Sequence, residues 1–167
     1  KKRKAAAKRK QEMGLDALKP WDKAVDPLGR GPLKPFETGE ELLEKTIEVF
    51  DEMDPFLGNC LKEMVTLDRF DLDSRKGKNP GGYNYPLEET GYPFIFMNAA
   101  GTVRDVVTLL HEGGHAVHSI LTKDLALNSF RNFPSEVAEL ASMSMELMTM
   151  DLWGHYFTNP EESKRAK

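Results

Sequence analysis

The sequence predicts a mainly α-helical protein with a small β hairpin or edge strand, and three observations support this class. Apolar residues recur every three or four positions over several long stretches, as in helices that bury one face. A single short apolar run with β-favouring members, residues 93–97, lies between turn-forming residues. Of the 167 residues, 40% are hydrophobic, which is enough for one modest core.

Two helices are expected in the first half of the chain. Thr38 can cap a helix with Glu41 in the capping-box position, and the apolar spacing that follows predicts a helix from about Gly39 to Met53. Asp54 can cap a second helix, because the next residue is a proline and proline suits a first helical position. The apolar positions of this second helix are Leu57, Leu61, Met64 and Leu67.

The middle of the chain predicts the β structure. Residues 71–91 are rich in glycine and proline and lack a helical period, so a loop or irregular hairpin is expected there. The apolar run 93–97 then predicts a strand, which we place at a sheet edge near Asn98.

Two more helices are expected in the second half. Thr102 is a good N-cap with Asp105 three residues on, and the helix that it begins has an apolar face formed by Val103, Val106, Val107, Leu109, Leu110, Val117, Ile120 and Leu121. The last helix begins at Pro134–Ser135 with Ser135 as its cap. Its leucines and methionines predict a mostly buried helix in which methionine fills the core.

The first ten residues differ from the rest in charge. Seven of them are basic although the whole chain has a formal net charge of −4. We interpret residues 1–13 as a basic helical or disordered tail, and residues 14–167 as one domain. No aromatic residues alternate with these charges, so no nucleic-acid partner is expected.

The remaining composition narrows the cellular setting. The sequence has no apolar stretch of the length that a membrane span needs and no apolar signal-peptide core, so no membrane partner and a cytoplasmic location are expected. Cys60 is the only cysteine, which excludes an internal disulfide and fits a reducing compartment.

The residues with the clearest chemistry are His111-Glu112-Gly113-Gly114-His115. On a helix, histidines four residues apart lie on one face and can bind one zinc ion. Glu112 is about 100° around the helix from His111, where a general base for the attacking water must be. A chance match in an average chain is rare, and two glycines inside a helix cost about 1 kcal/mol each. The glycines indicate a close approach by another helix or by substrate.

The third zinc ligand should come from the last helix, which offers Glu136 and Glu139. We favour Glu139, because an acidic residue in the first turn, such as Glu136, is already explained by the helix dipole. Glu146 is seven residues beyond Glu139 on the same face. It can accept a hydrogen bond from a ligating histidine, although a solvated glutamate explains it equally well.

At this point the sequence resembles the oligoendopeptidase F branch of the thimet oligopeptidase family. The resembling segments lie from about Leu15 onward and are residues 18–22, 75–78, 81–83, 93–98, 105–118 and 139–142. The last of these resembles the third-ligand motif of the family, so the resemblance also implies Glu139 as a ligand.

The resemblance implies zincin-like catalytic helices with a short antiparallel sheet, one Zn²⁺ per chain, and hydrolysis of internal bonds of short peptides through a zinc-activated water. It also implies that Asn98 and Ala99 lie beside an extended peptide substrate. Family members are several times longer. Residues 14–167 are therefore expected to be a partial metallopeptidase catalytic domain, and the missing remainder of the enzyme is an expected partner. The alternative is a zinc-binding helical fragment without independent catalytic activity.

Overall fold

The computed structural model describes residues 2–23 and 25–167, and the chain separates into two compact units between Leu33 and Lys34. The first unit contains helix α1 (Lys2–Glu12) and a short 3-10 helix, η1 (Pro20–Lys23). Lys1, the first residue of the predicted basic tail, lies outside the described residues. The tail boundary at residues 13 and 14 remains a prediction.

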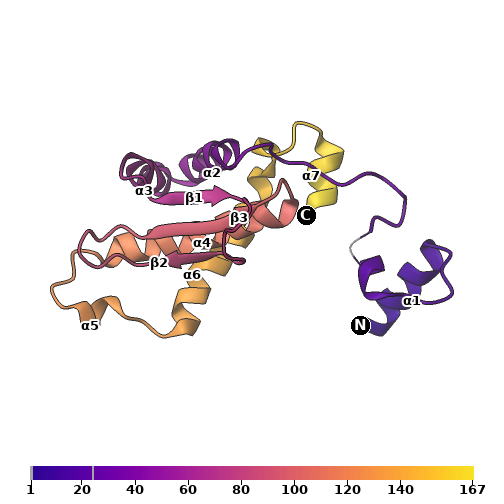
Figure 1. Cartoon of the computed structure of the whole chain (residues 1–167), viewed down its shortest axis with the longest axis horizontal. Coiled ribbons are helices and arrows are strands. Elements are labelled where there is room, and N and C mark those ends of the chain that lie inside the picture. Colours follow the sequence, from indigo (N-terminus) through magenta and orange to yellow (C-terminus); the bar gives the residue numbers. More distant parts are fainter. Residues whose placement is uncertain (1, 24) are drawn as a thin grey trace. The chain divides into compact units, whose positions relative to one another are not determined.

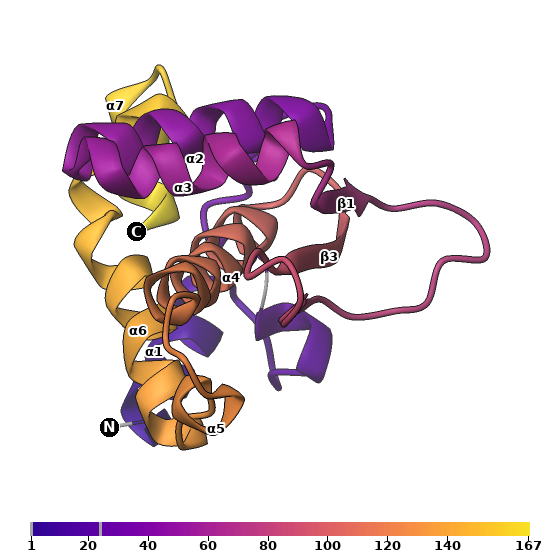
Figure 2. The same ribbon diagram turned by 90° about the vertical axis from the view of Figure 1, so that its left-hand side faces the viewer.

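The second unit contains all the elements that form the candidate site. Helix α4 lies between the small sheet and helix α6, and the paired helices α2 and α3 pack across it (Figures 1 and 2). The elements of this second unit are α2 (Gly39–Met53), α3 (Pro55–Thr66), β1 (Phe70–Asp73), β2 (Tyr83–Tyr85), β3 (Phe94–Ala99), α4 (Val103–Thr122), α5 (Asn128–Arg131), α6 (Ser135–Met148), η2 (Met150–His155) and α7 (Pro160–Ala166).

Three predicted helix starts are confirmed by their caps. The Thr38 side chain accepts a hydrogen bond from the Glu41 N–H at the start of α2. The Asp54 carboxylate accepts from the Phe56 N–H before α3, and α4 begins with the complete capping box of Thr102 and Asp105. Each cap satisfies backbone N–H groups that the first helical turn leaves without a partner.

The sheet corrects two expectations. Its strand order is β1-β3-β2, with β1 parallel and β2 antiparallel to β3, so the sheet is mixed rather than antiparallel. Strand β3 is therefore the central strand and not the expected edge strand, although β2 pairs only with its residues 94–96 and the end of β3 near Asn98 has a strand partner on the β1 side alone. The difference comes from β1, which lies partly in the segment expected to be a loop and covers the second side of β3.

Tertiary contacts explain why a strand forms at Phe70–Asp73 despite its two aspartates, which are unfavourable in strands. The Lys78 ammonium is buried and lies 2.9 Å from Oδ1 of Asp71, and Arg75 binds both oxygens of the same carboxylate. The hydrogen bonds from Arg75 are the main reason why the pKa of Asp71 is well below its usual range. Asp73 accepts from the Gly39 N–H at the start of α2.

Helix α4 has a largely buried apolar face, as predicted. Val106, Leu109 and Leu110 are fully or almost fully buried. The other largest buried side chains of the core are Phe50, Leu42, Leu61, Met64, Ile95 and Met97. Burial of these side chains removes apolar surface from water and fixes α4 against both α2 and β3.

Helix α6 differs from the prediction in two respects. Pro134, not Ser135, occupies the cap position, and no side chain caps the helix. The helix is also not mostly buried: only Ser142 and Met145 are buried, while its remaining large apolar side chains are exposed, namely Val137, Leu140, Met143, Leu147 and Met148. The reason is that α6 packs mainly on α4, so only one of its faces is covered.

No helix within residues 2–23 and 25–167 combines the length and the apolar character that a membrane crossing requires. The cytoplasmic location expected from the sequence remains a prediction.

His155 fastens η2 to α2 through two glutamates. Its Nε2 is 2.7 Å from Oε2 of Glu52, and its Nδ1 is 3.0 Å from Oε2 of Glu48. A neutral imidazole has one N–H, whereas the protonated ring can donate to both carboxylates. The hydrogen bond to Glu52, with that to Glu48, therefore raises the pKa of His155.

Replacing His155 with alanine is expected to destabilise the fold most at acidic pH. A raised pKa gives stability that is fully present below the ordinary histidine pKa of about 6.5 and is lost as the pH rises through the folded-state pKa. The loss should be about 1 kcal/mol or less, because the glutamates are largely exposed. Thermal unfolding of both proteins from pH 5.5 to 8.5 measures it. A stability difference that grows with pH contradicts this prediction, and Glu52→Gln should show the same trend as the alanine variant.

Candidate metal centre

Two adjacent helices bring three potential metal ligands together. Ligand atoms of His111 and His115 on α4 and of Glu139 on α6 all lie within 4.8 Å of one another. Nε2 of His111 is 3.3 Å from Oε2 of Glu139, and Nε2 of His115 is 3.8 Å from Oε1 of the same carboxylate. Each of the two imidazoles therefore directs its Nε2 at the Glu139 carboxylate.

Glu146 fixes the orientation of the first histidine. Nδ1 of His111 is 2.6 Å from Oε1 of Glu146, which lies about two turns along α6 from Glu139. An ionised carboxylate can only accept, so a proton on Nδ1 satisfies this contact and leaves Nε2 with its lone pair on the side of Glu139. That tautomer is the one in which Nε2 can bind a metal ion.

The two glycines between the histidines allow both neighbouring helices to approach. A Cβ on Gly114 would lie 2.7 Å from the Cα of Ser142 in α6, and one on Gly113 would lie 2.8 Å from Cζ of Phe50 in α2. Contacts this short are not tolerated without movement. The close approach inferred from the sequence is therefore made by helices, and α6 can bring Glu139 to the histidines only because residue 114 has no side chain.

Glu112 is the buried carboxyl group of this site. It is only 8% exposed, and burial is the largest of the causes that raise its pKa. The nearby Glu139 carboxylate acts in the same direction. The backbone carbonyl of Glu112 accepts a hydrogen bond of 3.3 Å from Nδ2 of Asn84 in β2, which joins the sheet to this turn of α4. Burial also lowers the pKa of His115 and so favours its neutral form.

The other residues that the sequence predicts for the site are not among the three potential metal ligands. Glu136 is exposed in the first turn of α6 and does not join the three ligand atoms. Nδ2 of Asn98 donates to the carbonyl oxygens of Asn79 and Gly81, and the Ala99 carbonyl accepts from the Ser74 N–H. A role of Asn98 and Ala99 in substrate binding remains a prediction.

Two supporting residues were not identified from the sequence. Oγ of Ser142 is 3.3 Å from Oε2 of Glu139 and can hold that carboxylate in place. Asn84 ties β2 to Glu112 as described above. The only sequence signal for Asn84 is the alternation Tyr83-Asn84-Tyr85, which places the amide on one face of a strand and both tyrosines on the other.

The donor set fits zinc. Two imidazole nitrogens and one carboxylate are typical ligands of catalytic zinc sites, which leave a further coordination position for water or substrate. The oriented Nε2 of His111, and the burial that favours the neutral form of His115, suit a metal ion in the space that these three ligand atoms enclose. His118, on the next turn of α4, does not join the group and stacks on Phe133 with ring centroids 3.8 Å apart.

Comparison with known proteins assigns the chain to a class of peptidases. It belongs to peptidase family M3, whose family model matches residues 1–167. Among curated proteins, the chain is 29% identical over 161 residues to oligopeptidase PepF of Bacillus subtilis (strain 168), covering 96% of this chain and 23% of that protein. It is 31% identical over 108 residues to the chromosomal oligoendopeptidase F of Lactococcus lactis subsp. cremoris, covering 65% of this chain and 15% of that protein.

A solved structure agrees with this assignment. The structure described as PZ peptidase A with an inhibitor superimposes with a TM-score of 0.88 at 29% sequence identity, covering 98% of this chain and 28% of that one. The expected resemblance to oligoendopeptidase F and the mainly helical fold class are thereby confirmed. The chain spans only 23% of the PepF relative.

Proposed function

We propose that this chain carries the zinc-binding and catalytic helices of a zinc-dependent endopeptidase that hydrolyses internal bonds of short peptides. The observation that supports this most directly is the convergence of His111, His115 and Glu139 within 4.8 Å, with Glu112 buried beside them. The peptidase names of the relatives support the reaction class, and the site chemistry supports the metal.

His111, His115 and Glu139 would hold the ion. Bound zinc polarises a substrate carbonyl and makes water a better nucleophile at neutral pH. Within the protein, Glu112 would accept the proton of the attacking water at its carboxylate and later deliver it to the leaving amine. Its burial suits both steps, because a raised pKa brings the carboxyl group closer to the working pH. Glu146 would keep His111 oriented throughout.

An extended peptide needs an open strand edge near Glu112, and the sheet indicates which edge that is. Strand β3 is paired on both sides at Ile95 and Phe96, whereas β2 pairs only with β3 among the strands that the structure describes. Asn84 of β2 contacts Glu112, so the open side of β2 is the edge next to the site. We propose that a peptide adds to β2 by main-chain hydrogen bonds. Asn98 and Ala99 would then contribute indirectly, because Asn98 holds the loop at 79–81 that precedes β2.

Replacing Glu112 with glutamine is expected to lower the peptide hydrolysis rate by at least about 10²-fold, because the amide cannot accept the proton of water. The zinc content should stay at one ion per chain. Hydrolysis of an internally quenched peptide, together with metal analysis of the same sample, measures both quantities. Glu136→Gln is the matched control and should behave as the unchanged chain. Full hydrolysis by a zinc-loaded Glu112→Gln variant would show that Glu112 is not the base.

A second reading is supported by the short coverage of the relatives, namely a zinc-binding helical fragment without turnover of its own. The same samples distinguish the two readings. One bound zinc with hydrolysis supports the enzyme, whereas one bound zinc without hydrolysis by this chain supports the fragment.

A further inference from the structure

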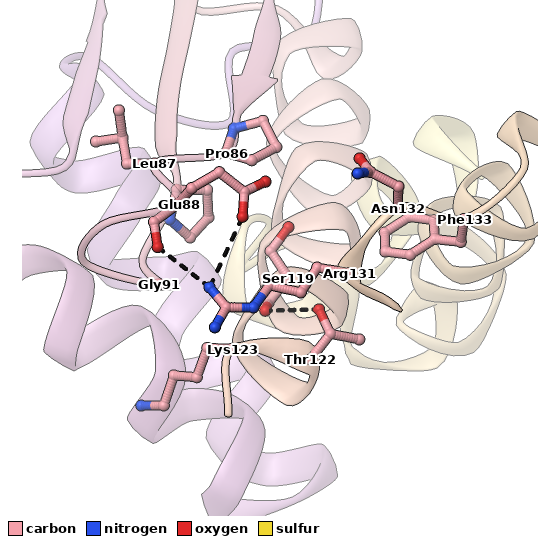
Figure 3. A pocket seen from close by; sticks show the side chains of 11 residues that line it. Pro86, Leu87, Glu88, Gly91, Ser119, Thr122, Lys123, Arg131, Asn132 and Phe133 are labelled. Carbon is pink, nitrogen blue, oxygen red and sulfur yellow. Dashed lines mark hydrogen bonds and ion pairs between the residues drawn. The ribbon is translucent and has the colours of Figure 1, made fainter. Parts of the chain in front are cut away.

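A pocket of about 150 Å³ lies beyond the metal centre, at the C-terminal end of α4. Its walls come from three segments that are far apart in the sequence: residues 86–93 after β2, Ser119 and Thr122 of α4, and residues 131–133 after α5 (Figure 3). The sequence alone gave no indication of it.

The pocket continues the face of α4 that bears the metal ligands. Ser119 and Thr122 follow His115 by four and seven residues, so all of them and His111 lie within about 80° of one another around the helix. Ser119 and Thr122 are about 6 Å and 10 Å further along the helix axis than His115. An extended peptide advances about 3.3 Å per residue, so a peptide that runs along α4 would reach the pocket two or three residues from a bond held at the metal centre.

Arg131 gives the pocket its charge. In Figure 3 its guanidinium points into the pocket, while the Lys123 ammonium points away; the latter donates to the Tyr92 hydroxyl. Nε and Nη2 of Arg131 donate to the Leu125 carbonyl and Nη1 to that of Glu88. Of its five N–H groups, two thus have no acceptor among the residues that the structure describes. The Glu88 carboxylate is 3.7 Å from Nη1 and half exposed, so an entering anion can displace it.

The other walls suit the rest of a peptide. The hydroxyl groups of Ser119 and Thr122 donate to carbonyl oxygens of their own helix, which leaves their lone pairs free to accept from peptide N–H groups. Phe133, which stacks on His118, and Leu87, which comes from another wall of the pocket, provide apolar surface.

We infer that this pocket binds a carboxylate of the peptide, two or three residues from the cleaved bond, through the guanidinium of Arg131. The carboxylate is either the C-terminus of a short peptide or an acidic side chain. As a substrate subsite, the inference rests on the proposed peptidase function, but carboxylate binding by the pocket does not require the metal.

The test is therefore made on the 167-residue chain in EDTA, so that no metal ion can bind a carboxylate. Three peptides are titrated while the Nε–H resonance of Arg131 is followed by NMR: acetyl-Ala-Ala-Ala with a free C-terminus, the same peptide amidated, and acetyl-Ala-Glu-Ala amide. A free C-terminus or a glutamate should shift the resonance saturably, and the neutral amide should not. Which acidic peptide binds identifies the source of the carboxylate.

Two variants check the location. Arg131→Gln should weaken binding of the acidic peptide about tenfold or more, because it removes charge-assisted hydrogen bonds. Ser119→Leu, which leaves the contacts of Arg131 in place and fills the pocket from α4, should weaken binding similarly. The exposed Arg104→Gln makes the same charge change at the other end of α4 and should have little effect. Circular dichroism confirms that each variant is folded.

The inference is overturned if the acidic peptides bind no better than the neutral amide, or if both folded pocket variants keep full affinity. Failure of the proposed peptidase function gives a different pattern. In that case Glu139→Ala would leave the zinc content unchanged, or Glu112→Gln would leave the hydrolysis rate unchanged. The acidic peptides in EDTA would still shift the Nε–H resonance of Arg131.

Discussion

Gly114→Ala is expected to weaken zinc binding at least tenfold and to lower the free energy of unfolding by about 1–3 kcal/mol. The added Cβ would lie 2.7 Å from the Cα of Ser142 and 3.0 Å from the Ala141 carbonyl oxygen, both backbone atoms of α6. A backbone cannot rotate away as a side chain can. Helix α6 must therefore move from α4 and take Glu139 with it. Calorimetric zinc titration and chemical unfolding measure the two effects.

Gly113→Ala is the matched control, because it adds the same methyl group one residue earlier. Its Cβ would meet Cζ and Cε1 of the Phe50 side chain in α2 instead of α6. We expect some loss of stability, since Phe50 is fully buried, but a zinc affinity close to that of the unchanged chain. Equal zinc affinities for both variants would show that close packing of α6 is not what positions the third ligand.

Glu139→Ala is expected to reduce zinc affinity by more than about 100-fold. Loss of a residue that only orients a ligand typically costs 10-fold to 100-fold, and loss of a ligand should exceed this. Glu146→Ala should fall within that lower range, because it removes the acceptor for Nδ1 of His111 but leaves all three proposed ligands. Competition with a chromophoric zinc chelator measures affinities over this span.

The control for this series is Glu136→Ala, which removes the same charge from the exposed first turn of α6. It should bind zinc as the unchanged chain does. The ligand assignment fails if Glu136→Ala and Glu139→Ala lose similar affinity, because the effect would then come from the general charge of α6.

Local signals predicted the helices that begin with caps. The starts of α2, α3 and α4 follow from Thr38, Asp54 and Thr102, since a cap is a contact between residues three or fewer positions apart. Strand β1 could not be found in this way, because its aspartates are compensated by Lys78, Arg75 and the start of α2. The exposure of α6 was also hidden, since an apolar pattern does not show what packs against it.

The site was predictable to the extent that it lies on regular helices. The histidine pair needs only the helical period, and the choice of Glu139 over Glu136 needed only the position within α6. Asn84 and the Arg131 pocket depend on how separate segments meet, which no local pattern in one sequence specifies. The central position of β3 is likewise not specified by any local pattern, because it depends on a partner strand more than twenty residues earlier.

The three proposed zinc ligands come from two helices, His111 and His115 from α4 and Glu139 from α6. Zinc held by α4 and Glu139 would act as a cross-link between residues 28 positions apart, closing the loop that includes α5. Because the three ligands are together only in the folded chain, metal binding would stabilise the folded state by mass action. Only two residues of helix α6 are buried, so the bound ion would contribute much of the stability of its packing on α4. The amide protons of α6 should therefore exchange with solvent more slowly when zinc is present.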